Sequence, residues 1–266
     1  MALPYSIQQA CDNKKILKTI IGIDNFNIMN SIEKVKAAEI SGATYIDIAA
    51  NIDILLELKA CVSLPICVSS ICTQELIKSY KAGADMLEIG NFDIFYGKHI
   101  ALSEKHILSM VRELKYSVPD ASICVTIPHI FNINQQITLT QKLCQLGVDM
   151  IQTEGIVSKQ VSIVDVADII KLSSSTLGSA SILSNVVNTP VIASSGINPL
   201  TAPIAISCGA VGVGIGSFLN YFDSSLEISK EIDEIINAMK LNVCSERKTK
   251  NYVLEKDLCS LLSKVS

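Results

Sequence analysis

One pattern recurs four times along the chain and limits the folds that it can adopt. Each copy places a glycine after a helical stretch and then begins an apolar strand. The copies are SGATYIDIAA from Ser41, AGADMLEIGN from Ala82, LGVDMIQTEG from Leu146 and CGAVGVGIGS from Cys208. Glycine readily adopts the left-handed conformation that ends many helices. The pattern therefore predicts four equivalent helix-to-strand junctions.

Four further strand candidates lie between these copies and complete an alternating pattern. They are KTIIGID near 18–24, LPICVSS near 64–70, ASICVTIP near 121–128 and TPVIASSG near 189–196. The intervening segments have helical spacing, as in IEKVKAAEI from Ile32, which Asn30 and Glu33 are predicted to cap. Eight strands that alternate with helices predict an α/β fold, a single (β/α)8 TIM barrel.

The barrel accounts for residues 1–266 as a single domain, with the barrel core over about 17–222. A short helix is expected within 1–16, and two terminal helices within 224–264, separated by a turn at the charged SERKTKN segment. The connection over 155–189 contains the polar run SSSTLGS, which indicates a solvated loop or a lid over the ligand. An open doubly wound sheet is the alternative. It is disfavoured because GVGIGS at 212–217 lacks the third glycine of a dinucleotide-binding loop and lies in the last strand.

The amino-acid composition argues against two classes of binding partner, membranes and nucleic acids. The chain has 266 residues, 49% of them hydrophobic, which is enough for one large core. No apolar run reaches the roughly 18–20 residues that a membrane-spanning helix needs, so a soluble protein without membrane contact is expected. The net charge of −4 argues against nucleic-acid binding, as does the presence of only two arginines, Arg112 and Arg247. Apolar helix positions leave room for a homo-oligomer.

The cysteines are expected to be reduced thiols. There are nine, an odd number, and no C-x-x-C pair occurs. Cys67 and Cys72 come closest to a metal-binding pair, but one is predicted in a strand and the other in a turn. The first residues, MALPYSIQQACDNKK, have neither an apolar signal core nor the composition of a transit peptide.

Strand alternation separates the residues that face the helices from those that face the barrel interior. Aligned copies of the pattern put four polar or small residues inward, and four more lie one layer nearer the carboxyl-terminal mouth. The inward set is Asp47, Glu88, Gln152 and Gly214, and the mouth set is Ala49, Gly90, Glu154 and Gly216.

Acidic side chains inside a barrel are unfavourable unless they are paired or bound to a cation. Asp47 and Glu88 are therefore predicted to be acid/base residues or ligands of a divalent metal, and Glu154 is a third catalytic candidate. The alternative is a hydrogen-bonded polar layer that only holds neighbouring strands. His129 follows the fifth strand, where an imidazole can transfer protons near neutral pH.

The segment from 191 to 218 indicates a phosphate site. Ser195 and Gly196 follow the seventh strand, and Gly216 and Ser217 follow the eighth. Barrels frequently bind phosphate with the loops after these two strands, where glycine lets an oxyanion approach the backbone. The alternative is that the glycines only form tight turns.

Elimination reduces the number of reaction classes that the sequence supports. A Schiff-base aldolase needs a buried strand lysine with a lowered pKa, and no lysine is expected in a strand core. Flavin mononucleotide would fit the phosphate site but favours a nearby cation, and only loop Lys98 is available. The expectation is therefore an isomerase, epimerase or metal-assisted lyase of a small phosphorylated metabolite. A non-catalytic metabolite-binding or scaffold protein is the alternative, and a flavin mononucleotide-dependent oxidoreductase is less favoured.

Six segments of the chain resemble one known family. They are KAAEISGATYIDIAAN, LPICVSS, AGADMLEIGNFDIFY, VTIPH, LGVDMIQTEG and IASSGI, within about residues 16–220. These motifs are similar to the hypothetical chloroplast reading frame 23 family of algal plastids and cyanobacteria. The resemblance implies a phosphate-binding TIM barrel and a location in the plastid, in the chloroplast stroma. It transfers no catalytic residue and no cofactor.

Overall fold

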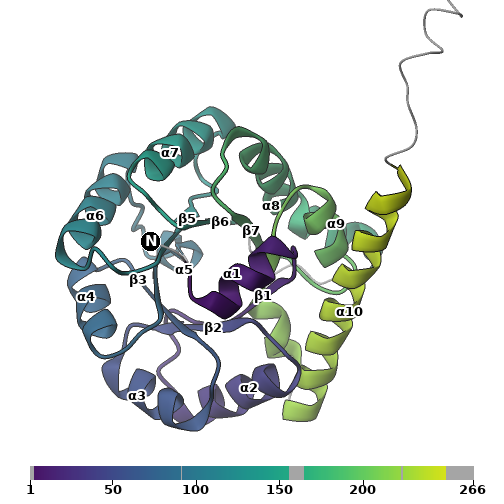
Figure 1. Cartoon of the computed structure of the whole chain (residues 1–266), viewed down its shortest axis with the longest axis horizontal. Coiled ribbons are helices and arrows are strands. Elements are labelled where there is room, and N and C mark those ends of the chain that lie inside the picture. The colour runs from purple at the N-terminus through teal and green to yellow at the C-terminus, as the bar shows by residue number, and fades with distance from the viewer. Residues whose placement is uncertain (1–2, 91, 156–164, 223, 250–266) are drawn as a thin grey trace, which may run out of the picture.

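The recurring glycines end helices, as predicted. Gly42, Gly83, Gly147 and Gly209 all have positive φ angles, between +77° and +107°. Each is followed within a few residues by a strand, so the chain reverses from the outer helices to the inner sheet at equivalent places. The computed structural model describes residues 3–90, 92–155, 165–222 and 224–249 and shows a closed barrel wrapped by helices (Figure 1).

The barrel consists of eight parallel strands in sequence order, with β1 paired to β8. This confirms the predicted (β/α)8 fold and rules out the open sheet. The strands are β1 (Ile16–Gly22), β2 (Tyr45–Ala49), β3 (Ile66–Ser70), β4 (Met86–Ile89), β5 (Ile123–Ile127), β6 (Met150–Thr153), β7 (Val191–Ser194) and β8 (Gly212–Ile215).

The helices surround the strands, and their apolar faces bury the main hydrophobic core against the outer side of the barrel. The described helices are α1 (Tyr5–Asp12), α2 (Ile28–Ile40), α3 (Ile52–Cys61), α4 (Thr73–Lys81), α5 (Asp93–Tyr96), α6 (Glu104–Ser117), α7 (Ile133–Gln145), α8 (Val166–Val186), α9 (Ala202–Ser207), the 3₁₀ helix η1 (Ser217–Tyr221) and α10 (Ser225–Thr249).

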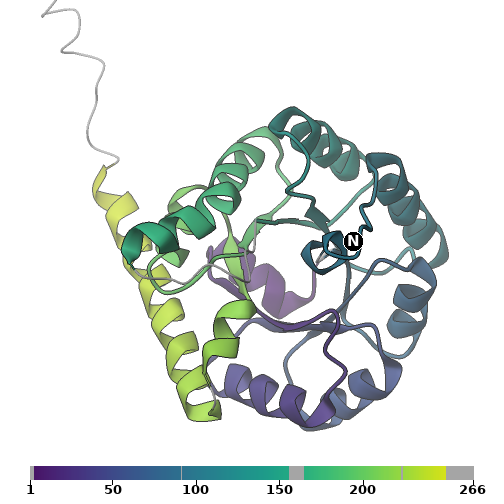
Figure 2. The ribbon, with the colours of Figure 1, turned by 180° about the vertical axis from the view of Figure 1, so that it is seen from behind.

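Helix α1 closes the amino-terminal end of the barrel, where it lies across the opening in Figure 1. Its Ile7 and Cys11 belong to a second core cluster with the lowest inward side chains of the strands, such as Tyr45 and Met150. The opposite end, seen in Figure 2, is formed by the loops that follow the strands. With α1 across the amino-terminal opening, a ligand of the barrel interior is expected to enter from the carboxyl-terminal end.

The polar SSSTLGS run is helical, so the prediction of a loop or lid there is wrong. It lies inside α8, and its hydroxyls anchor the helix: Ser173 donates to the Ile169 carbonyl, Thr176 donates to the Ser194 carbonyl, and Ser179 donates to Gln136 Oε1 at 2.8 Å. Within a helix, serine and threonine hydroxyls can donate hydrogen bonds to backbone carbonyls of the preceding turn. These side chains fix α8 to the end of β7 and to α7.

Two predicted helix boundaries also need correction. Asn27, rather than Asn30, caps α2, and its side chain accepts a hydrogen bond from the Asn30 backbone N–H. At the other end of the chain α10 continues to Thr249, through most of the SERKTKN segment, where a turn was expected. Its lysines, arginine and glutamate are good helix formers, which explains the continuation. The second terminal helix, expected before residue 264, lies outside the described residues.

Candidate active site

A layer of polar side chains crosses the barrel interior above the apolar layer that α1 covers. The inward phase predicted for Asp47, Glu88 and Gln152 is confirmed by their mutual partners in the barrel. We call the set the polar layer; its members are Lys18, Asp47, Ser69, Glu88, Thr126, Gln152 and Ser194, all buried. Barrel interiors are usually filled by branched apolar residues. A layer of this composition is therefore an unusual feature of the chain.

Lys18 is the centre of the polar layer. Its ammonium lies 2.6 Å from Glu88 Oε2, 3.0 Å from Asp47 Oδ2 and 2.9 Å from Gln152 Oε1. The expectation that no strand core contains a lysine is wrong, because β1 begins at Ile16 and places Lys18 inside the barrel. Its neighbour in β8 is Gly214, where an added Cβ would lie 3.0 Å from Ser194 Oγ and 3.2 Å from Ile20 Cδ1.

The remaining oxygens of the carboxylates are also hydrogen-bonded. Ser69 donates to Asp47 Oδ1 at 2.5 Å. Glu88 Oε1 accepts from Thr126 Oγ1 at 3.0 Å and from Gln152 Nε2 at 2.9 Å. Apart from Ser194, the members of the polar layer thus form a connected network in which one ammonium faces two carboxylates.

Burial and the neighbouring charges shift the pKa values of Lys18 and Glu88 in opposite directions. Burial alone would lower the pKa of Lys18, but the carboxylates of Asp47 and Glu88 outweigh it and raise the pKa well above its ordinary value. Burial raises the pKa of Glu88, and Lys18 opposes that change without cancelling it. Lys18 is therefore protonated at neutral pH and is not a Schiff-base nucleophile. Glu88 is the carboxyl of the network that takes up a proton more readily than usual.

A second cluster lies at the mouth, after β5 and β6. Glu154 Oε2 accepts a hydrogen bond from the Tyr96 hydroxyl at 2.8 Å and from the His129 backbone N–H at 3.2 Å, and lies 3.0 Å from His129 Nδ1. The rings of Tyr96 and His129 meet edge to face, with centroids 5.0 Å apart. Two predicted site residues, His129 and Glu154, are thus brought together. Tyr96 was missed because α5 follows a different strand.

The predicted phosphate residues lie in the turns after β7 and β8. These strands are neighbours, and Ser194 is paired with Gly214, so Gly196 and Gly216 follow at the same level of the barrel. Ser195 has a φ of +82°, which is unusual for a residue other than glycine. Such strain is often found at functional sites. A Cβ on Gly196 would lie 2.7 Å from the Leu172 carbonyl oxygen, so this turn packs directly on α8.

Two hydroxyl residues of α8 extend this turn region. A Cβ on Gly155, the residue after Glu154, would lie 2.9 Å from Thr176 Oγ1, 3.1 Å from Ser175 Oγ and 3.1 Å from Ser195 Cβ. Gly155 therefore lets the β6 loop approach Ser175 and Ser195 closely. The SSSTLGS run was the signal for Ser175, but it was interpreted as a loop rather than as part of a helix.

Metal ligation by cysteine finds no support in the geometry. Cys67 is buried inside the barrel, whereas Cys72 is exposed before α4. Within the described ranges no group of three or more His, Cys, Asp or Glu side chains is placed to hold a metal ion. In the polar layer the cation paired with the two carboxylates is Lys18 itself.

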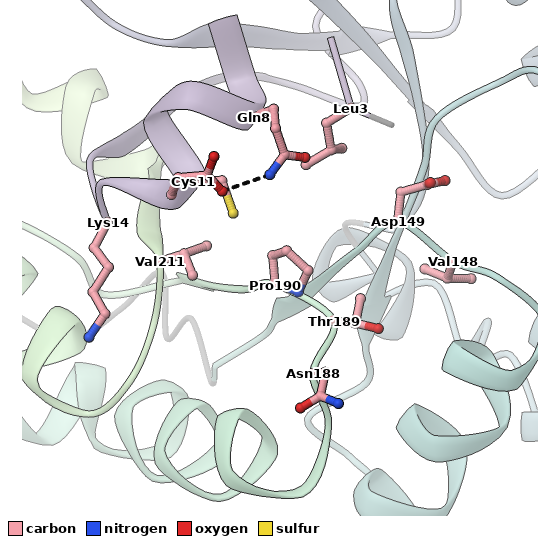
Figure 3. A pocket seen from close by; sticks show the side chains of 11 residues that line it. Leu3, Gln8, Cys11, Lys14, Val148, Asp149, Asn188, Thr189, Pro190 and Val211 are labelled. Atoms are coloured by element: carbon pink, nitrogen blue, oxygen red, sulfur yellow. Dashed lines mark hydrogen bonds between the residues drawn. The ribbon is translucent and has the colours of Figure 1, made fainter. Parts of the chain in front are cut away.

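A cavity of about 680 Å³ opens at the amino-terminal end of the barrel, opposite the carboxyl-terminal mouth and beside α1 (Figure 3). It is lined by Leu3, Gln8, Cys11, Asp12, Lys14, Val148, Asp149, Asn188, Thr189, Pro190 and Val211. Gln8 is hydrogen-bonded to Asp12, and burial together with the Asp12 charge raises the pKa of the Cys11 thiol, which makes it a poor nucleophile. The cavity contains no member of the polar layer, and this end of a barrel usually serves stability rather than catalysis.

The family follows from sequence comparison. A protein-family model described as "Protein of unknown function (DUF561)" matches residues 3–245. The chain belongs to this family. It is 44% identical over 232 residues, or 84% of each chain, to the "Uncharacterized protein ycf23" of Antithamnion sp.. It is 38% identical over 242 residues, 91% of this chain and 89% of the relative, to the protein of that name from Pyropia yezoensis. These DUF561 relatives are plastid-encoded in algae, which confirms the resemblance inferred from the motifs.

Solved structures similar to this DUF561 chain share its fold. The (S)-3-O-geranylgeranylglyceryl phosphate synthase of Thermoplasma acidophilum, in complex with sn-glycerol-1-phosphate, has a TM-score of 0.63 at 11% identity and covers 91% of this chain and 99% of its own. A 3-hexulose-6-phosphate synthase has a TM-score of 0.61 at 14% identity, covering 84% and 99%. Both are barrel proteins whose names include a phosphorylated compound. In the described part of the DUF561 chain, no helix combines the length and hydrophobicity needed to cross a membrane.

Proposed function

We propose that this protein binds a small phosphorylated metabolite at the carboxyl-terminal end of the barrel and catalyses proton transfer on it, as an isomerase, epimerase or lyase. The observation that carries the proposal is the polar layer, in which the buried ammonium of Lys18 contacts the buried carboxylates of Asp47 and Glu88 inside the barrel. Buried charge is unfavourable for stability, and its retention often serves a reaction or specific binding.

The phosphate is held by the turns after β7 and β8, with Ser195, Gly196, Gly216 and Ser217 as its contacts. In support, the two turns leave adjacent strands at the same level. Backbone N–H groups beside glycines can approach an oxyanion closely, and serine hydroxyls add hydrogen bonds. Barrels of this type commonly bind phosphate at this place.

His129 is the proton carrier, and Glu154 positions it. A proton on His129 Nδ1 would be donated to Glu154 Oε2, which leaves Nε2 as the acceptor for a substrate proton. Asp47 and Glu88 lie deeper in the barrel, where Glu88 supplies a proton. Both carboxylates hold the Lys18 ammonium, which stabilises the negative charge that develops on the substrate. Lys18 holds both carboxylates in place.

The phosphate site is tested by thermal unfolding in phosphate and in chloride at equal ionic strength. Phosphate at ten times its dissociation constant is expected to stabilise the protein by about 1.4 kcal/mol, or about 3 °C in Tm. Ser217→Asp should remove this shift, because a carboxylate at the exposed Ser217 repels the phosphate. Gly216→Asp tests the adjacent position.

Ser109→Asp is the matched control, because Ser109 is exposed on α6, away from both turns. This variant should keep the full phosphate shift. Equal shifts in the parent and in Ser217→Asp, or no shift in the parent, would contradict the phosphate site and favour the interpretation of two tight turns.

A non-catalytic metabolite-binding protein is the second candidate, and the closed polar layer favours it. Lys18 and Glu88 are fully buried, so a substrate reaches them only through a change in the loops above. A turnover assay distinguishes the catalytic proposal from the non-catalytic one. The catalytic proposal predicts a new product when the protein is incubated with a metabolite extract, and loss of that product in His129→Gln. Binding without product in the parent would support the second candidate.

We place the protein in the chloroplast stroma, since its relatives are plastid-encoded in algae. Recovery of the native protein with thylakoid membranes, rather than with the stromal fraction, would contradict this placement.

A further inference from the structure

Four large apolar side chains are exposed along the segments that follow β1 and β8. Phe26 directly precedes the N-cap of α2 and Met29 lies in the first turn of that helix, with exposed fractions of 59% and 72%. Tyr221 ends η1 and Leu226 begins α10, with exposed fractions of 69% and 81%. We call these four residues the apolar strip. Single exposed apolar residues are ordinary, but a group of them indicates a binding surface.

The two halves of the apolar strip belong to neighbouring parts of the molecule. β1 is paired with β8, and α10 packs against α2. The Lys34 ammonium of α2 donates a hydrogen bond to Asn220 Oδ1 of η1 at 2.6 Å. Figure 2 shows the start of α10 beside α2 at this corner of the barrel. Because η1 begins at Ser217, the strip continues directly from the proposed phosphate turn.

Lys34 adds a positive charge to this surface. Burial lowers the pKa of Lys34, and within the described residues no ion pair joins its ammonium to a carboxylate. A half-buried cation of this kind is complementary to an anion. Apolar side chains beside such a cation suit a ligand that has both an anionic group and an apolar portion.

We propose that the phosphorylated ligand carries an apolar portion and that this portion lies on the apolar strip while its phosphate occupies the turns after β7 and β8. This rests on the proposed phosphate site. The ligand class is a phosphate monoester of an alkyl, isoprenoid or aromatic alcohol rather than a phosphorylated polyhydroxy sugar. A protein partner would also cover apolar side chains, but it would not require the adjacent phosphate.

The probes are inorganic phosphate, ethyl phosphate, octyl phosphate and octanol, each titrated by calorimetry below the micellar concentration. Octyl phosphate is expected to bind at least about tenfold more tightly than ethyl phosphate, because several methylene groups leave water on the strip. The double variant Phe26→Ser with Tyr221→Ser should lose this gain and keep the affinity for ethyl phosphate.

Tyr116→Ser is the control, because Tyr116 is also highly exposed but lies near the end of α6, away from the strip. It should retain the gain. Equal affinity for the two esters, a gain that survives in the double variant, or octanol binding as tightly as octyl phosphate would each overturn the proposal and leave the phosphate site standing. Failure of inorganic phosphate and both esters to bind would overturn the proposed function itself.

Discussion

Replacement of Lys18 by methionine is expected to destabilise the fold by about 3–5 kcal/mol, because removal of one partner leaves buried charge without compensation. The ammonium is the shared partner of Asp47 and Glu88, and all three side chains are at most 1% exposed. Methionine has a similar length and fills the same space, so a loss of packing contributes little. Urea unfolding at pH 7 measures the change.

Lys142→Met is the matched control. Lys142 also pairs with a carboxylate, Glu104 Oε1 at 2.6 Å, but both side chains remain partly exposed, at 48% and 31%. Exposed pairs of this kind contribute about 0–1 kcal/mol. Adding Glu88→Gln to Lys18→Met should restore part of the lost stability, because one of the two uncompensated charges is then removed. A loss below about 1 kcal/mol in Lys18→Met would contradict the prediction, because it would show that the two buried carboxylates do not need the ammonium as a partner.

Alkaline pH is expected to lower the free energy of unfolding by about 3 kcal/mol between pH 7 and pH 10, through two buried thiols. Burial raises the pKa values of Cys67 and Cys124 well above the ordinary value, and the nearby carboxylates of Asp47 and Glu88 add to this. Above the ordinary thiol pKa the unfolded chain releases protons that the folded chain keeps. The unfolded state then binds fewer protons, so stability falls by about 1.4 kcal/mol per pH unit for each thiol.

The double variant Cys67→Ser with Cys124→Ser tests this origin. Serine keeps a hydroxyl near each carboxylate but does not ionise in this pH range. The variant should lose about 3 kcal/mol less than the parent between the two pH values. Cys72→Ser is the control, since this thiol is exposed. Parallel pH curves for the parent and the double variant would contradict the assignment. Burial also raises the pKa of Tyr45, whose contribution has the same sign at higher pH.

The predictions for Lys18 and for the two thiols both require that the polar layer is closed to water. Lys18, Glu88 and Gln152 come from β1, β4 and β6, and their contacts exclude water from the barrel centre. The mouth cluster of Tyr96, His129 and Glu154 lies above and retains some exposure. We therefore interpret the polar layer as the buried, charged part of the site. The mouth cluster is interpreted as its accessible part, which carries the proton.

Local sequence patterns are sufficient to predict the barrel and the direction of its strand residues. Both follow from local periodicity: glycine-ended helices repeat at each junction, and alternation in a strand places Asp47 and Glu88 on the inner face. The same patterns located the turns after β7 and β8. The helical SSSTLGS run was missed because its hydroxyls are satisfied by neighbours that are distant in sequence, such as Gln136 and Ser194.

The contacts between these inward residues, in contrast, depend on the closed barrel. Lys18 bonds to partners 70 and 134 residues away, across the barrel rather than along a strand. Glu154 likewise joins Tyr96, 58 residues earlier. Closure of the sheet and the stagger of its strands set these distances. No local pattern encodes them, because they exist only when all eight strands have closed on themselves.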